Sequence, residues 1–223
     1  MEEAKETGRI EAFSDGVFAI AITLLVLELK IEPGEGDLFS AIISQWGMFL
    51  AFFISFATIG IMWINHHRLF TLIRHSDHVL LLLNLLLLLM IVLVPFPTAL
   101  LSEYGQSTTA QHNPTFLRDA AALYSGTFIF IAIFFNALWR YATYKNRLLG
   151  KNVDPRAVAT VSQQYLLGPL LYLLAFVVAF FSVPLCLIIN GLLALFFAIP
   201  GKPIGGAPQA KSQAREEGRL EEV

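Results

Sequence analysis

Long uncharged apolar runs are the feature of this sequence that most restricts what the chain can fold into. A helix that crosses a bilayer needs roughly 17 to 25 apolar residues, and four runs meet this length: 42–64, 79–101, 120–138 and 161–181. The chain is 14% charged, whereas a typical soluble domain carries about 25% charged residues. We therefore expect an all-α integral membrane protein surrounded by membrane lipid, and we exclude a soluble domain.

A fifth apolar run, 183–199, follows 161–181 almost directly. A single helix over both runs would be far longer than a bilayer requires. Ser182 and the helix-breaking Pro184 instead predict a tight hairpin between two helices.

The apolar run nearest the N-terminus, 16–27, is short enough to be either a helix or the core of a signal peptide. The residues before it are mostly acidic, and Glu28 and Lys30 stand where a small-residue cleavage site would be expected. These features favour a membrane helix over residues 9–29.

Six transmembrane helices are thus predicted, at about 9–29, 42–67, 79–101, 119–141, 160–181 and 183–199. The loops after the second and fourth helices are basic, whereas those after the first and third are not. Basic loops stay in the cytoplasm, so both termini are predicted to be cytoplasmic. Residues 1–200 then form the membrane domain. Residues 201–223, rich in Gly, Pro, Gln and charge, form a disordered cytoplasmic tail.

Several functions find no support in the residues. The net charge of −2 gives no reason to expect a nucleic-acid partner. Cys186, the single cysteine, cannot form an internal disulfide. His75 and His78 have helical spacing, but no nearby Cys or clustered Glu completes a metal site. The Gly-x-Ser-x-Gly, Walker and His-Glu-x-x-His motifs are absent, as is a Thr-Val-Gly-Tyr-Gly filter. We expect no enzyme activity, no cofactor and no bound metal.

Polar residues cluster at one predicted membrane level. The first helix carries Arg9, Ser14 and Asp15, the second ends near His66, and the third carries Asn84. Polar groups in hydrocarbon are costly and survive by pairing. We favour a structural network that pins three helix ends together. Direct ion or proton chemistry is the other interpretation, since imidazole titrates near neutral pH.

The first helix also carries a stripe at spacings of three and four residues: Gly16, Ile20, Thr23, Leu24 and Leu27. Such a stripe is most simply packing against a neighbouring helix. Alternatively it is a pore wall, in which apolar rings gate by size and dewetting and a hydroxyl ring replaces part of an ion's hydration.

Residues 9–15 read Arg-Ile-Glu-Ala-Phe-Ser-Asp. This segment resembles the Arg-x-x-x-Phe-Ser-Asp signature of the transmembrane protein 175 family, the endolysosomal potassium channels and their prokaryotic relatives. The resemblance continues in Trp63, His66, Arg68-Leu69-Phe70, Asn84-Leu85 and Pro95-Phe96-Pro97. It is specific over roughly the first hundred residues and topological beyond them.

The resemblance implies a six-helix subunit that forms a homotetramer, with the first helix of each subunit lining a central pore. It implies a hydrophobic constriction at Ile20, further apolar layers at Leu24 and Leu27, and a potassium-selecting hydroxyl at Thr23. It also implies a network that positions the pore helix, made of Arg9, Phe13, Ser14, Asp15, His66 and Asn84. Ala19 stands where some members have serine, so we expect modest discrimination between potassium and sodium.

The sequence therefore predicts a potassium-preferring cation channel of a prokaryotic cytoplasmic membrane, with potassium ions as the permeant species. A proton-coupled or proton-conducting transporter that uses Asp15 and His66 is the alternative. A membrane-embedded enzyme built on the cytoplasmic histidines is a third interpretation.

Overall fold

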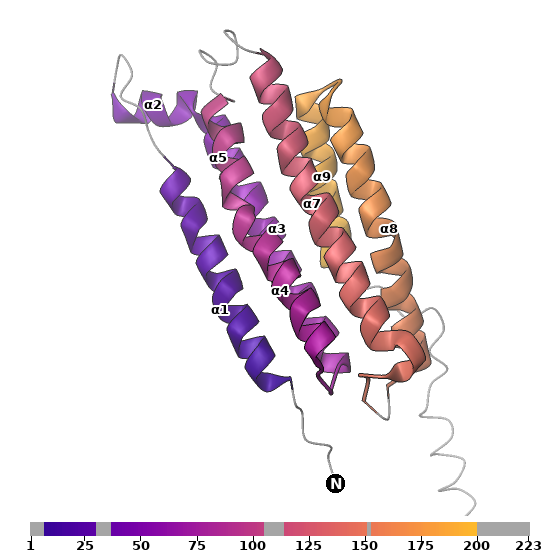
Figure 1. Cartoon of the computed structure of the whole chain (residues 1–223). Coiled ribbons are helices and arrows are strands. Elements are labelled where there is room, and N and C mark those ends of the chain that lie inside the picture. Colours follow the sequence, from indigo (N-terminus) through magenta and orange to yellow (C-terminus); the bar gives the residue numbers. More distant parts are fainter. Residues whose placement is uncertain (1–6, 30–36, 105–113, 151–152, 200–223) are drawn as a thin grey trace, which may run out of the picture.

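The computed structural model describes residues 7–29, 37–104, 114–150 and 153–199, and these residues form an all-helical bundle (Figure 1). The elements are α1 (Gly8–Leu24) with the 3₁₀ turn η1 (Leu25–Glu28), α2 (Leu38–Ser44), α3 (Trp46–Leu72), α4 (His78–Leu93), α5 (Pro95–Tyr104), α7 (Pro114–Thr143) with η2 (Tyr144–Asn146), α8 (Pro155–Ala179) and α9 (Val183–Ala198). The predicted tail, 201–223, lies outside the described residues.

Five stretches of the described residues are long and apolar enough to cross a membrane: Gly8–Glu28, Trp46–Leu72, His78–Ser102, Thr115–Asn146 and Pro155–Ala179. The chain is therefore a multi-pass integral membrane protein. A further apolar helix, α9, has 16 residues and is shorter than these five. The long helices run alternately up and down, so α1 begins and α9 ends toward the same end of the bundle (Figure 1).

The second predicted helix, 42–67, differs from the observed elements at both ends. Its first residues belong to α2, which starts where the Asp37 carboxylate accepts a hydrogen bond from the Ser40 N–H at 3.0 Å. The backbone leaves helical geometry at Gln45, and α2 lies across the end of the bundle (Figure 1). At its other end the predicted helix is too short, because α3 continues through polar residues to Leu72. The apolar run ends at the first charged residue, but a helix needs no apolar side chains in its last turn.

Two other boundaries follow local chemistry. The predicted helix 79–101 is interrupted at Val94, between α4 and α5, because Pro95 has no N–H and its ring crowds the preceding turn. The predicted hairpin is present: α8 ends at Ala179, Phe180 and Phe181 form the turn, and the Ser182 hydroxyl caps α9 by accepting the Leu185 N–H at 3.4 Å.

α7 lies at the centre of the bundle and packs most extensively against α8, with further contacts to α4, α5 and α9. Its fully buried side chains include Tyr124, Phe128 and Trp139. By contrast, α1 stands at one edge, where it packs against α3 and α4 (Figure 1). This edge position gives α1 one side on the bundle and one side away from it.

At the end where α1 begins, two connecting segments are joined as a clasp, residues 72–77 with 141–150. The Leu148 carbonyl accepts the N–H groups of Arg74 and His75 at 2.9 and 3.2 Å, and the Leu72 carbonyl accepts the Gly150 N–H at 3.2 Å. A Cβ at Gly150 would stand 3.0 Å from the Arg74 side chain, so the close approach of the two segments favours glycine there.

Candidate functional site

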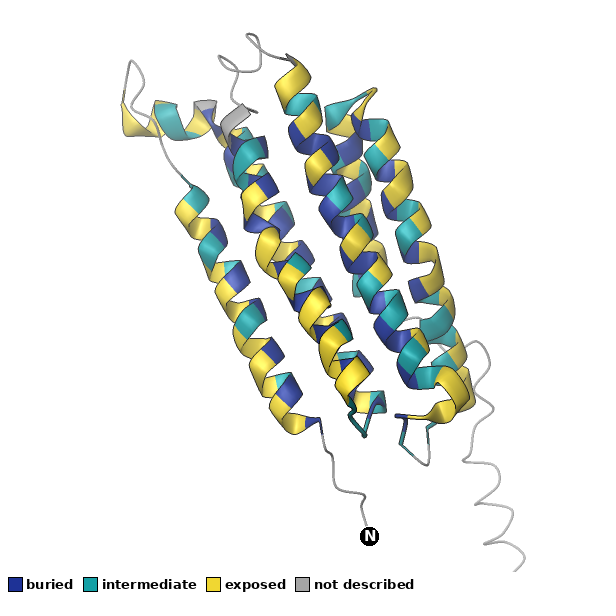
Figure 2. Cartoon of the chain, viewed as in Figure 1, coloured by how far each residue is buried: buried dark blue, intermediate teal, exposed yellow. Residues whose placement is uncertain are grey.

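The two sides of α1 differ sharply in burial (Figure 2). The buried side faces the rest of the bundle and consists of Ile10, Ser14, Phe18, Ala21 and, in η1, Leu25. On the other side the exposed fractions are 59% for Phe13, 58% for Ile20 and 64% for Leu27. Large aliphatic side chains on that side are left uncovered by the described part of the chain.

The residues predicted to line a pore lie on or beside this exposed side. Ile20, Thr23 and Leu27 are exposed, and Leu24 is half-buried. The Thr23 hydroxyl donates to the Ile20 carbonyl oxygen at 2.9 Å. Since its one O–H is used, Thr23 presents oxygen lone pairs, which are acceptors.

Three of the predicted network residues form a buried hydrogen-bonded chain. His66 Nε2 donates to Asn84 Oδ1 at 2.9 Å, and Asn84 Nδ2 donates to Ser14 Oγ at 3.0 Å. Ser14 Oγ then donates to the Ile10 carbonyl at 2.8 Å. Ser14, His66 and Asn84 are all at least 97% buried. The chain joins α1, α3 and α4 through side chains alone.

The His66 ring contacts two aromatic side chains, with ring centroids 5.4 Å from Phe18 and 4.6 Å from Phe70. Its Nδ1 is buried and has no hydrogen-bond partner among the described residues. The hydrogen bond to Asn84 fixes the tautomer that carries its proton on Nε2. A neutral ring suits this setting, because a second proton on Nδ1 would find no acceptor there.

The other predicted network residues are placed differently. Asp15 is exposed and accepts a hydrogen bond from Trp63 Nε1 at 2.8 Å, which ties α1 to α3 a second time. Arg9 and Phe13 lie on the exposed side of α1. Within the described residues, the structure shows no hydrogen bond or ring contact between these two side chains and the other four.

The comparisons with known proteins identify the family. A family profile described as the endosomal/lysosomal potassium channel TMEM175 matches residues 9–95. A potassium channel of Chamaesiphon minutus is 48% identical over 201 residues, which cover 88% of this chain and 96% of that relative. The chain belongs to the TMEM175 family.

Other relatives include bacterial and vertebrate proteins. A potassium channel of Streptomyces collinus is 43% identical, with 89% of this chain and 95% of the relative covered. The crystal structure of a lysosomal potassium-selective channel TMEM175 homolog from Chamaesiphon minutus aligns with a TM-score of 0.76 and 45% identity, covering 88% of this chain and 98% of that one. The endosomal/lysosomal proton channel TMEM175 of Homo sapiens is 34% identical over 153 residues, 29% of its length.

This TMEM175-family protein also contains polar contacts between helices that the sequence does not predict. The Ser55 hydroxyl lies 2.9 Å from the Thr98 hydroxyl and 3.2 Å from that of Tyr124. Asn190 Nδ2 donates to Ser125 Oγ at 2.9 Å, which links α9 to α7. Most of these are small polar residues within apolar runs. The sequence shows that pattern, but it does not show which of the residues contact each other.

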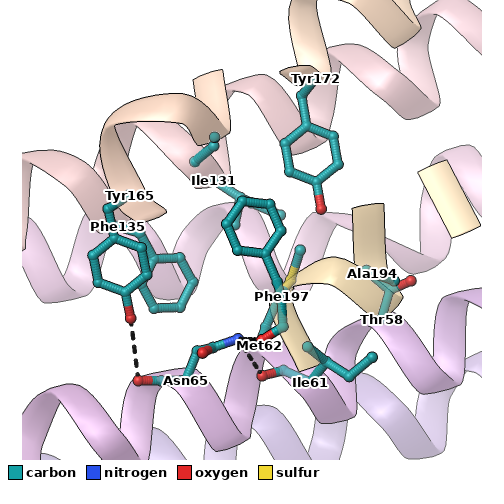
Figure 3. Close-up of a pocket in the computed structure, with 12 residues that line it drawn as sticks. Thr58, Ile61, Met62, Asn65, Ile131, Phe135, Tyr165, Tyr172, Ala194 and Phe197 are labelled. Atoms are coloured by element: carbon teal, nitrogen blue, oxygen red, sulfur yellow. Dashed lines mark hydrogen bonds between the residues drawn. The ribbon is translucent and has the colours of Figure 1, made fainter. Parts of the chain in front are cut away.

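A small cavity of about 40 Å³ lies between α3, α7, α8 and α9 (Figure 3). Tyr165 and Tyr172 of α8 both point their hydroxyl groups toward α3 (Figure 3). The Tyr165 hydroxyl donates to the Asn65 carbonyl at 3.4 Å, and Asn65 Nδ2 donates to the Ile61 and Phe197 carbonyls at 3.0 and 2.9 Å.

Among the described residues, no group of three or more His, Cys, Asp or Glu side chains could hold a metal ion.

Outside the spanning segments, Asp77 anchors the clasp. Its carboxylate accepts the Leu80 N–H at 2.9 Å and the Tyr141 hydroxyl at 2.6 Å, and Arg147 lies 3.3 Å away. Partial desolvation acts to raise the pKa of Asp77, but the hydrogen bonds from Tyr141 and Leu80 and the charge of Arg147 together hold it below the ordinary value. The charged carboxylate is therefore the form that the clasp stabilises.

Proposed function

We propose that this protein is a potassium-preferring cation channel of a prokaryotic cell membrane, in which four identical subunits surround a pore lined by α1. The relatives at 48% and 43% identity are both named potassium channels. The single observation that carries the proposal is the unpartnered apolar side of α1, with Ile20 58% and Leu27 64% exposed on a helix at the bundle's edge. A fourfold arrangement would bring these side chains together in rings.

In this arrangement the Ile20 ring is the narrowest part of the pore, and Leu24 and Leu27 form the next apolar layers. An apolar neck resists ions because it offers no replacement for lost hydration. Thr23 lies within this series, and its lone pairs supply that replacement in part. Potassium crosses passively, without a cofactor. Ala19 offers no second hydroxyl, so the preference over sodium is modest.

The buried contacts of α1 set which residues face the pore. Successive helical residues are about 100° apart, so a small rotation of α1 would remove Ile20 from the axis. The chain from Ser14 through Asn84 to His66 and the Asp15–Trp63 bond resist such a rotation at two points. Arg9 and Phe13 lie on the exposed side and would complete this network at the contact between subunits.

The orientation follows from charge. We propose six crossings, with α9 as the sixth, and both termini in the cytoplasm. Under this topology the clasp, the start of α1 and the basic residues of the η2 segment are cytoplasmic, as basic loops favour.

Cation flux into liposomes of purified protein tests the proposal. Ile20→Ala should widen the constriction, and Ile20→Asn should let water enter it. Lowering a barrier by about 1.4 kcal/mol raises a rate about tenfold, and we expect at least that increase in potassium flux. Ile188→Ala is the matched control, because Ile188 is 57% exposed on α9. Flux that is the same for the Ile20 and Ile188 variants would contradict the proposed constriction.

Proton conduction is the second candidate function, because vertebrate relatives are named proton channels. Asp15 and His66 would carry it. The described residues show Asp15 bonded to Trp63 and His66 bonded to Asn84, with no hydrogen bond between the two. Flux that requires a pH gradient and falls in Asp15→Asn would favour this function over potassium conduction.

A further inference from the structure

A second, larger cavity lies at the end of the bundle where α3 ends and α8 begins, apart from the exposed side of α1. Its volume is about 230 Å³, whereas one water molecule occupies about 30 Å³ in the liquid. The polar residues lining it are Asn65, Arg68, Thr71, Asp154, Thr160, Gln164 and Tyr165. The spans Trp46–Leu72 and Pro155–Ala179 end and begin here, so the cavity is at the level of lipid headgroups.

The cavity contains hydrogen-bond donors with spare capacity. Arg68 is half-buried, and its guanidinium makes one hydrogen bond, 3.4 Å from Nη1 to Asn65 Oδ1, within the described residues. A guanidinium has five N–H donors, so most remain for a ligand. Gln164 is half-buried and adds an amide. This set fits the oxygen atoms of a phosphate, which guanidinium groups bind well.

The same cavity contains acceptors. Asp154 supplies a carboxylate. The hydroxyls of Thr71 and Thr160 donate to the carbonyls of Arg68 and Arg156, at 2.6 and 2.9 Å, so their lone pairs are left as acceptors. Acceptors beside a carboxylate fit an ammonium group. A purely anionic ligand would meet repulsion from Asp154.

We propose that this cavity binds the headgroup of a zwitterionic phospholipid with a primary ammonium group, such as phosphatidylethanolamine. The phosphate contacts Arg68 and Gln164, and the ammonium contacts Asp154 and the threonine oxygens. The apolar lining of Leu69, Leu72 and Val161 meets the glycerol and upper acyl chain. Anionic lipids prefer clusters of several basic side chains, whereas one Arg and one Asp suit a zwitterion. A choline headgroup has no N–H to donate to the acceptors.

Native mass spectrometry of the full-length, delipidated protein measures this binding. Phosphatidylethanolamine, phosphatidylglycerol and phosphatidylcholine are titrated separately, and inorganic phosphate is added as a competitor. We expect phosphatidylethanolamine to bind most tightly and millimolar phosphate to leave it bound. Equal retention of the three lipids would overturn the proposal. Displacement of the lipid by phosphate would identify a soluble anion as the ligand and overturn it too.

Two variants separate the two kinds of contact. Arg68→Gln should lower the affinity for phosphatidylethanolamine about tenfold, the worth of a charge-assisted hydrogen bond. Arg140→Gln is its control, since Arg140 is exposed and does not line the cavity. Equal affinities for these two variants would contradict the phosphate contact.

Asp154→Asn removes the charge but keeps a good N-cap for α8, because asparagine caps helices as well as aspartate does. It should abolish the preference for phosphatidylethanolamine over phosphatidylglycerol. This test does not depend on whether the Arg68→Gln variant folds. A preference that survives Asp154→Asn would contradict the ammonium contact. The measurement involves no ion flux, so its failure would leave the proposed channel untouched.

Discussion

At the scale of single residues, the hydrogen bond from Thr23 to the Ile20 carbonyl determines what the hydroxyl offers an ion. With its proton directed at the backbone, the oxygen is free to accept. Replacing Thr23 with Val removes that oxygen at nearly constant volume. A hydrogen bond is worth about 0.5–1.5 kcal/mol, so we expect the potassium-to-sodium permeability ratio to fall by roughly two- to tenfold.

Reversal potentials under potassium and sodium gradients measure this ratio. Thr23→Ser is the matched control, because it keeps the hydroxyl and the backbone acceptor, and its ratio should stay near that of the unmodified channel. Equal ratios for the Val and Ser variants would show that the hydroxyl contributes nothing to selectivity.

Asn84 is the residue whose loss should cost most in the buried chain. Asn84→Leu leaves the His66 Nε2–H without its acceptor and removes the donor to Ser14. An unsatisfied buried group costs about 1–3 kcal/mol, and we expect a loss of unfolding free energy in that range in mixed micelles. Leu85→Ala, at an exposed neighbouring position, should cost less. The opposite order would show that the chain is not a stabilising contact.

At the scale of elements, the clasp should depend on pH through Asp77. Its pKa is lowered from 3.8 on folding. Such a group contributes stability that is present above the unfolded value and is lost as the pH falls through the folded value. The Arg147 side chain is 57% exposed, so the ion pair adds less than about 1 kcal/mol.

Asp77→Asn keeps an N-cap for α4 but removes the charge. It should lower thermal stability at pH 7, and its difference from the unmodified protein should shrink as the pH falls below 3.8. Asp119→Asn breaks the exposed Arg118–Asp119 pair and serves as control. A pH-independent difference for Asp77→Asn would contradict the role of its carboxylate.

The elements also show where sequence reasoning succeeds. Apolar runs predicted the long helices because a bilayer demands that length, and Ser182 with Pro184 predicted the hairpin because their effects are local. The α2–α3 break at Gln45 carries no comparable local signal. Likewise, the sequence predicts Ser14 and Asn84 as buried polar residues, but the hydrogen bond from Trp63 to Asp15 depends on how two helices face each other. Which side of α1 is unpartnered also depends on the whole bundle.

At the scale of the whole molecule, the number of crossings can be read from labelling. Cys186 is fully buried, so added cysteines dominate the signal. Gly8→Cys meets no atom within 4 Å, and Ile199 and Phe39 are exposed. With six crossings, an impermeant maleimide should label Gly8→Cys and Ile199→Cys from one side and Phe39→Cys from the other. Labelling of Ile199→Cys from the side of Phe39→Cys would show that α9 does not cross.

The bond between Asn190 of α9 and Ser125 of α7 bears on how the protein is made. A 16-residue apolar segment with an amide near its middle partitions poorly into lipid by itself, because the amide needs a partner there. Ser125 belongs to a helix synthesised earlier and already in place. Under the six-crossing topology proposed above, α9 therefore enters the membrane beside the Ser125 hydroxyl, and a nascent chain that lacks α7 should insert α9 less efficiently.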